Sequence, residues 1–247
     1  MNLRANKVPA VTASFWAIKV LATTVGETFA DFLSVGLGLG LSLTSYAMGG
    51  LLLIVLWNQI RLHRYSLASY WLVVVLMSIT GTLITDRLID NLGMSLSTIS
   101  LIFGSILAVI FAVWYWREKT LAMHSIRTIR REIFYWTAIL FTFALGTAVG
   151  NWFAEALRLG YLYAAIIFGL SIALIALVYH YLRLDAVLAF WMVYILTRPL
   201  GASLGDLLSQ PHENGGYGLG TVNTSILFLS MIMSLIIYLS QKSREKA

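Results

Sequence analysis

Acidic residues recur at one position of a sequence pattern that occurs four times in the chain. The first copy is T-T-V-G-E-T-F-A-D-F-L (23–33), and its aspartate is matched by two further aspartates and one asparagine. In every copy a tryptophan stands fifteen residues before this polar residue and a glycine five before it. The tryptophans are 55, 65 and 55 residues apart, which indicates an internal repeat. The aligned positions are Trp16, Trp71, Trp136 and Trp191; Gly26, Gly81, Gly146 and Gly201; and Asp31, Asp86, Asn151 and Asp206.

Each of these polar residues lies in an apolar, helical run, where an ionisable side chain is costly and marks a functional site by default. Carboxylate and amide oxygens suit hard cations, and the chain has no cysteine and only four histidines, all near predicted loops. We therefore predict a site for a hard cation, which is Mg²⁺, Mn²⁺, Ca²⁺, Na⁺ or a proton. The sequence identifies no certain cofactor. The predicted cation-binding residues are Glu27, Asp31, Asp86, Asn151, Glu155 and Asp206, of which Glu27, Asp31, Asp86 and Asp206 are the candidate metal ligands.

Two basic residues share the apolar runs with these acids. Lys19 precedes Glu27 by two helical turns on one face, and Arg198 precedes Asp206 in the same way. We expect both to act as internal counter-charges. If all the inner acids are ionised, carboxylates remain in surplus, and protonation, a bound cation or water must compensate. The alternative is that these charges pair only to lock the helices together.

Small residues and tryptophans in the motif have structural interpretations. Glycine followed four residues later by another small residue permits close helix crossing in a membrane. We expect the four tryptophans to anchor the helices at the cytoplasmic interface. Pro199 is predicted to break its helix beside Arg198, as in transporter sites built from broken helices. The predicted packing glycines are Gly26, Gly81, Gly146, Gly150, Gly201 and Gly205.

Composition places these motifs in a membrane. Of the 247 residues, 59% are hydrophobic and 11% charged, and the mean hydropathy is +0.82. We predict an all-α, polytopic membrane protein with eight transmembrane helices, in a single domain 1–247 of four tandem hairpin repeats (about 13–60, 67–116, 133–182 and 186–240). The odd helices carry the acids and should lie inside. The predicted spans are 13–35, 40–60, 67–90, 96–116, 133–156, 160–182, 186–208 and 219–240.

The basic residues predict how the chain lies in the membrane. Thirteen of the 17 lysines and arginines fall before the first span, in alternate connections or at the chain end. The positive-inside rule places these segments and both termini in the cytoplasm, and accounts for the net charge of +6 without nucleic acid. With two spans per repeat, all repeats share one orientation and are pseudo-symmetric about the membrane normal. The motif acids then lie in the outer half of the membrane.

The four motif strings resemble a family of bacterial integral membrane proteins known mainly as a repeat of unknown function. The resemblance rests on 23–33, on Y-W…T-G-T…T-D (70–86), on Y-W…L-G-T-A-V-G-N-W (135–152) and on L-T-R-P-L-G-A-S-L-G-D (196–206). It covers almost the whole chain. It implies four two-helix repeats in the bacterial inner (plasma) membrane and no particular substrate. Asn151 departs from the aspartate that is more typical of the family.

No enzyme motif is present, and a lone G-x-G-x-G in a hairpin (36–40) lacks the strand and acid that a dinucleotide site needs. We expect a small-cation transporter, of a divalent metal or coupled to protons, with the lipid bilayer and the cation as partners. One alternative is a scaffold membrane protein with internally paired charges. Another is an organic-anion carrier centred on Arg198. The sequence leaves the substrate and the oligomeric state open, a homo-oligomer included.

Overall fold

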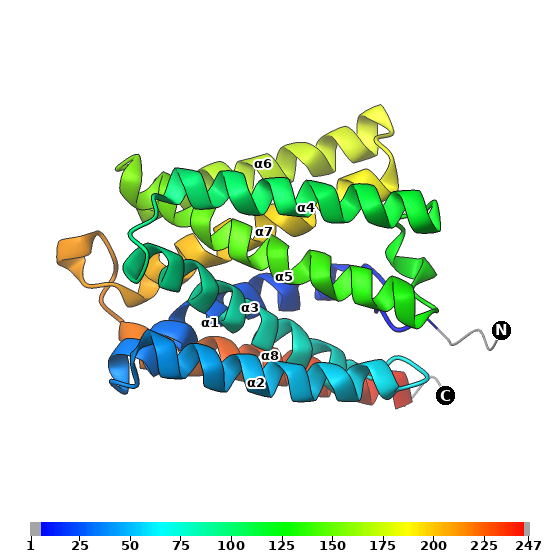
Figure 1. Cartoon of the computed structure of the whole chain (residues 1–247), viewed down its shortest axis with the longest axis horizontal. Coiled ribbons are helices and arrows are strands. Elements are labelled where there is room, and N and C mark those ends of the chain that lie inside the picture. The colour runs from blue at the N-terminus through cyan, green and yellow to red at the C-terminus, as the bar shows by residue number, and fades with distance from the viewer. Residues whose placement is uncertain (1–5, 245–247) are drawn as a thin grey trace.

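The computed structural model describes residues 6–244, with side chains through residue 242. That part of the chain folds into eight α-helices joined by short loops (Figure 1). Helices α1 (Ala13–Asp31) and α5 (Ile129–Asn151) each continue into a π-helical turn, η1 (Phe32–Gly36) and η3 (Trp152–Ala156). The other elements are α2 (Gly40–Arg61), α3 (Leu67–Asp90), α4 (Leu96–Glu118), η2 (Met123–Ser125), α6 (Tyr161–Leu182), α7 (Ala186–Ser209), η4 (His212–Asn214) and α8 (Gly220–Arg244).

Every predicted span matches a helix with its ends within four residues, when each π-helical turn is counted with its helix. Polar caps set several of the starts. The hydroxyl of Thr12 accepts the backbone N–H of Phe15 at 3.3 Å, and Thr128 caps α5 in the same way. The carboxylate of Asp185 accepts two backbone N–H groups at the start of α7. These caps satisfy N–H groups that a helix start leaves unpaired.

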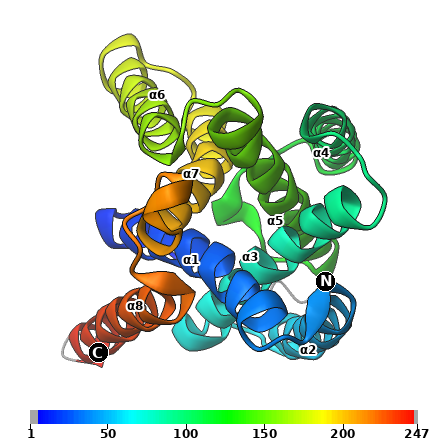
Figure 2. The same cartoon turned by 90° about the vertical axis from the view of Figure 1, so that its left-hand side faces the viewer.

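The odd-numbered helices form a closed inner ring. Helix α1 packs on α3, α3 on α5, α5 on α7 and α7 on α1, as the end-on view shows (Figure 2). The apolar windows of α3, α5 and α7 are 56–67% buried, whereas those of the four even-numbered helices are 17–28% buried. The prediction that the helices carrying the acids lie inside is therefore confirmed.

The predicted two-helix hairpin is wrong as a packing unit. Helix α2 packs along α3 and touches its own repeat mainly at η1, and it scarcely contacts α1. Likewise α4 packs on α5, α6 on α7, and α8 returns to α1 (Figure 2). After each odd helix, the connecting segment leads the chain away from that helix. The outer helix that follows therefore packs on the next inner helix of the ring. Each outer helix therefore covers the inner helix of the following repeat.

Seven of the helices, α2 to α8, are long and apolar enough to cross a membrane. The helix outside this set is α1, which carries Lys19 and Glu27 and ends at Asp31. Helices α1 and α7 pack closely, so α1 lies among helices that can span. The architecture is that of a multi-pass helical membrane protein.

Helix α7 is continuous through Pro199, so the predicted break is wrong. The ring of the proline lies against α5, where a side-chain carbon on Gly146 would come within 3.0 Å of its Cδ and one on Gly150 within 3.3 Å of its Cα. Nearby carbonyls also find donors, since the Thr197 hydroxyl donates to Tyr194 O at 2.7 Å and the Thr23 hydroxyl to Thr197 O at 3.1 Å. Neighbouring helices thus tolerate a proline that would bend an isolated helix.

One end of the bundle gathers the basic connections. The loops 62–66, 119–128 and 183–185 lie there together with the described start of the chain (Figure 1). Lys7 crosses this end, where its ammonium binds the Glu132 carboxylate at 2.6 Å and the Ile60 carbonyl at 2.8 Å. Arg4 and Lys246, two of the basic residues counted in the sequence, lie outside the described residues.

The four motif glycines make the four crossings of the inner ring. A side-chain carbon added to any of them would collide with the residue three before the next motif glycine around the ring. Ser78 meets Gly26, Phe143 meets Gly81, Arg198 meets Gly146 and Thr23 meets Gly201. Gly150 and Gly205 make further close contacts, with α7 and α1 respectively.

We expect Gly81→Ala to destabilise the protein by about 1–3 kcal/mol, because the new Cβ would lie 2.8 Å from Phe143 Cβ and 3.0 Å from the backbone nitrogen of Ala144. The matched control is Gly169→Ala on the outer helix α6, where nothing lies within 4 Å. Thermal denaturation in detergent measures both. Equal midpoints for the two variants would contradict the glycine crossings.

Candidate functional site

The inner ring stacks equivalent residues of the four repeats in levels along its axis. Successive levels are four residues apart on each helix, which is about 6 Å of rise. We name five levels from the end opposite the basic loops. They are the acid level (Asp31, Asp86, Asn151, Asp206), the threonine level (Glu27, Thr82, Thr147, Ala202), the arginine level (Thr23, Ser78, Phe143, Arg198), the lysine level (Lys19, Val74, Ile139, Tyr194) and the tyrosine level (Phe15, Tyr70, Tyr135, Phe190).

Arg198 occupies the centre of the bundle and is 0% exposed. Its Nη2 binds the Glu27 carboxylate at 2.6 Å and donates to the Thr147 hydroxyl at 2.7 Å. The same atom donates to the Thr82 hydroxyl, and Nη1 donates to the Thr23 carbonyl at 3.0 Å. One guanidinium is therefore bound by the other three inner helices, α1, α3 and α5.

Glu27 is the counter-charge that Arg198 uses. Glu27 is 3% exposed, and its carboxylate also accepts from the Thr82 hydroxyl at 3.3 Å. The sequence predicted that Lys19 and Arg198 pair with the acids, either along one helix, as Lys19 with Glu27 and Arg198 with Asp206, or across helices. The ion pair observed joins two helices, α1 and α7. A pair that is 171 residues apart in the chain is invisible to helical spacing.

The acid level holds three carboxylates and one amide at the mouth of the ring. Asp206 is buried, whereas Asp31, Asp86 and Asn151 are half-buried. Among the described residues, none of the three aspartates forms an ion pair or accepts a side-chain hydrogen bond. Asp86 and Asp206 both lie close enough to Glu27 and Asp31 for like charges to repel, and close enough to Arg198 to be attracted by its charge. If all of these acids are ionised, their negative charge exceeds what Arg198 alone balances.

Glu155 stands apart from this level. It lies in the π-helical turn η3, is exposed, and accepts a 3.4 Å hydrogen bond from the Tyr161 hydroxyl. It still repels Asp206 and Asp31 electrostatically, so it adds negative charge at the rim. The structure therefore brings Asp31, Asp86, Asn151 and Asp206 to one level and places Glu155 outside it.

The predicted metal ligands are not gathered into one preformed site. Within residues 6–244 no three Asp, Glu, His or Cys side chains are close enough together to hold a metal ion. Glu27 lies one level below the three aspartates and is engaged by Arg198. The arrangement can concentrate cations or share protons among carboxylates as it stands.

Lys19 lies below the ion pair, 0% exposed, between two aromatic rings. Its ammonium is 4.0 Å from the centroid of Phe143 and 4.2 Å from that of Tyr194. It has no hydrogen-bond partner among the described residues, and the positive charge of Arg198 repels it. Cation–π contacts are the stabilisation that this ammonium receives.

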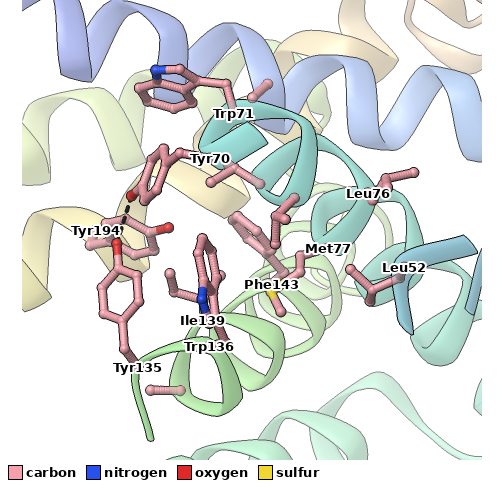
Figure 3. Packing of buried hydrophobic residues seen from close by; sticks show 14 of the residues in the cluster. Leu52, Tyr70, Trp71, Leu76, Met77, Tyr135, Trp136, Ile139, Phe143 and Tyr194 are labelled. Atoms are coloured by element: carbon pink, nitrogen blue, oxygen red, sulfur yellow. Dashed lines mark hydrogen bonds between the residues drawn. The ribbon is translucent and has the colours of Figure 1, made fainter. Parts of the chain in front are cut away.

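Sequence reasoning missed the tyrosines beneath Lys19. The hydroxyls of Tyr70 and Tyr135 share a 2.6 Å hydrogen bond inside the bundle, and the hydroxyl of Tyr194 points toward the same place (Figure 3). All three residues are 0% exposed. The signal was present, because an aromatic precedes each motif tryptophan, but only two of those four aromatics carry a hydroxyl.

The expectation that the motif tryptophans anchor the helices at a membrane interface is wrong for three of them, because Trp71, Trp136 and Trp191 are buried in the core. The fourth, Trp16, is half-buried. Each packs against the tyrosine-level aromatic of the preceding repeat, with ring centroids 5.4–6.1 Å apart. The tryptophans therefore hold neighbouring repeats together, because their rings contact the inner helix of the preceding repeat.

The four repeats alternate at the acid level. A π-helical turn directly follows Asp31 in the first repeat and Asn151 in the third, whereas α3 and α7 stay α-helical beyond Asp86 and Asp206. Such turns are frequent at functional sites because they re-aim side chains. Nothing in the spacing of apolar residues signalled them.

A ring of four inner helices with buried charges on its axis, enclosed by outer apolar helices, defines a four-repeat helical membrane protein. Comparison with protein families agrees. The family described as Repeat of Unknown Function (DUF347) matches residues 14–65, 69–120, 134–184 and 189–244, and the chain belongs to this family. No curated protein and no solved structure matches the chain.

We expect Arg198→Met and Glu27→Gln each to cost about 3–5 kcal/mol, because each leaves its partner buried and uncompensated. The double variant should cost clearly less than the sum of the two. The control is Arg127→Met at an exposed loop position, which should change nothing. Unfolding in detergent provides all four values, and strictly additive losses would contradict the pairing.

Proposed function

We propose that the protein is a small-cation transporter whose outer binding station is the acid level. The observation that carries this proposal is the set of Asp31, Asp86 and Asp206 at the mouth of the inner ring, without a cationic partner among the described residues. Carboxylates held in or near a membrane interior keep their charge only if a cation or water compensates it, and otherwise take up protons. Either outcome makes the level a place where cations bind.

The proposal includes a membrane arrangement. All eight helices cross the bilayer, the four repeats are pseudo-symmetric about its normal, and the basic end faces the cytoplasm. The membrane is the bacterial inner membrane, and both termini are cytoplasmic. The acid level then opens toward the outside and the tyrosine level lies near the inside.

The arginine and threonine levels close the path in this conformation. Arg198 is held by Glu27 and by groups on three helices, so its guanidinium fills the axis. A cation can pass only when Arg198 and Glu27 separate, and Glu27 is then free to bind that cation. Glu27 would thus exchange Arg198 for the transported cation, which is one way to couple the opening of the path to the movement of the cation.

The second candidate is a scaffold protein whose charges serve only to lock the bundle. The complete burial of the Arg198–Glu27 pair favours it. It leaves the surplus carboxylates of the acid level without a role. The organic-anion carrier stays a prediction with less support, because the guanidinium that would bind the anion is already bound by Glu27.

We expect the purified protein to gain thermal stability with the cation that it carries, or toward low pH if that cation is the proton. A ligand at about 100 times its Kd adds about 2.7 kcal/mol. The gain should be lost in Asp86→Asn. It should persist in Asp90→Asn, one turn further along α3 at an exposed position. A panel of Na⁺, Mg²⁺, Ca²⁺, Mn²⁺ and pH that leaves the wild type unchanged would favour the scaffold.

A further inference from the structure

The inner half of the bundle has a chemistry opposite to that of the acid level. Between the arginine level and the tyrosine level, the four inner helices carry no carboxylate (15–23, 70–78, 135–143, 190–198). Their charged groups are the cations Lys19 and Arg198. A metal ion entering this half would meet positive charge and few oxygen ligands, whereas metal sites for hard cations are built from several oxygens.

Lys19 and three buried tyrosines follow one another along this half. Lys19 stands against the ring of Tyr194, whose hydroxyl is buried without a partner among the described residues. That hydroxyl points toward the hydrogen-bonded pair Tyr70–Tyr135 (Figure 3). The three tyrosines come from three different inner helices, so the ring itself assembles the file.

Tyr65 extends this file toward the basic end, with its hydroxyl buried and without a partner among the described residues. Tyr65, in the loop before α3, has its ring 5.9 Å from that of Tyr70. Tyr65 also lines a groove of about 660 Å³ at the basic end, together with Thr12, Trp71 and Lys242. Burial raises the pKa of Tyr65, so its hydroxyl keeps its proton and can both accept and donate.

We propose that Lys19, Tyr194, Tyr70, Tyr135 and Tyr65 form the inner half of a proton path, and that the cation carried through this protein is the proton. This inference rests on the proposed function and names its substrate. Each step is an exchange of hydrogen bonds, in which a hydroxyl oxygen accepts one proton and releases its own to the next group. Neighbours that are not in direct contact require a bridging water for this exchange.

In this proposal Lys19 passes the proton from the acids of the outer half to the tyrosines of the inner half. Its ammonium gives a proton toward Tyr194, and the nitrogen lone pair then takes a proton that arrives from the carboxylates once the Arg198–Glu27 pair opens. The ammonium has no carboxylate partner to hold its proton, which is the condition for releasing it. Arginine at this position would not release a proton, because a guanidinium stays protonated in proteins.

The test is proton entry into liposomes that contain the full-length protein and a trapped pH-sensitive dye, driven by a potassium diffusion potential. We expect wild type to carry protons and Tyr70→Phe/Tyr135→Phe, Lys19→Met and Lys19→Arg each to lose at least tenfold in rate. Tyr163→Phe, on a lipid-facing position of α6, is the matched control and should keep the wild-type rate. Tyrosine-to-phenylalanine changes keep the ring packing, so folding is preserved.

A parallel assay with trapped metal-sensitive dyes distinguishes a failure of the proton path from a failure of the proposed transporter function. If Asp86→Asn abolishes proton entry while the Tyr70/Tyr135 and Lys19 variants keep it, the proposed file is wrong and the acid-level transporter stands. If wild type carries a metal ion and no protons, the inference is overturned and the proposed function stands. If neither protons nor metal ions move and no cation or pH change stabilises the protein, both are wrong.

Discussion

The structure depends on burying one guanidinium at the centre of a membrane protein. A charge in such an interior is tolerated only when it is balanced and hydrogen-bonded. Arg198 is stabilised because α1 supplies Glu27 and a carbonyl while α3 and α5 supply the Thr82 and Thr147 hydroxyls. Its two terminal nitrogens are bound in this way, and its Nε has no partner among the described residues. These partners reach it only because the motif glycines let the inner helices approach closely. The Arg198–Glu27 ion pair therefore forms only with closely packed inner helices, and the closely packed helices enclose a guanidinium that needs this ion pair.

The four repeats differ from one another at the two levels that carry the buried cations. At the arginine level the four equivalent residues are threonine, serine, phenylalanine and arginine, and at the lysine level only Lys19 is charged. Four lysines or four arginines at one level would repel one another, and each of the two buried cations occurs in a single repeat. The glycine crossings and the tryptophan contacts are instead repeated in every copy.

Much of this could be predicted from the sequence, for reasons that are local. Apolar run length placed the eight helices, and the distribution of polar residues identified the inner four. The fifteen-residue spacing from tryptophan to acid put Asp31, Asp86, Asn151 and Asp206 at one level. What could not be predicted depends on which helix faces which. Periodicity shows that a face is buried, but it does not name the neighbour, so the Arg198–Glu27 pair, the burial of Trp71 and the tyrosine pair were missed. The partner of each outer helix was missed for the same reason.

The interleaving of outer helices with the next repeat has a consequence for how the chain is made. No repeat is packed completely when it has been synthesised, because α2 packs on α3 of the next repeat and one side of α1 stays uncovered until α8 is made. The ring of helices therefore closes only after α8 has been synthesised. A half-length chain of two repeats would leave one inner and one outer surface unsatisfied, and a second copy of the same half has the surfaces that fit them.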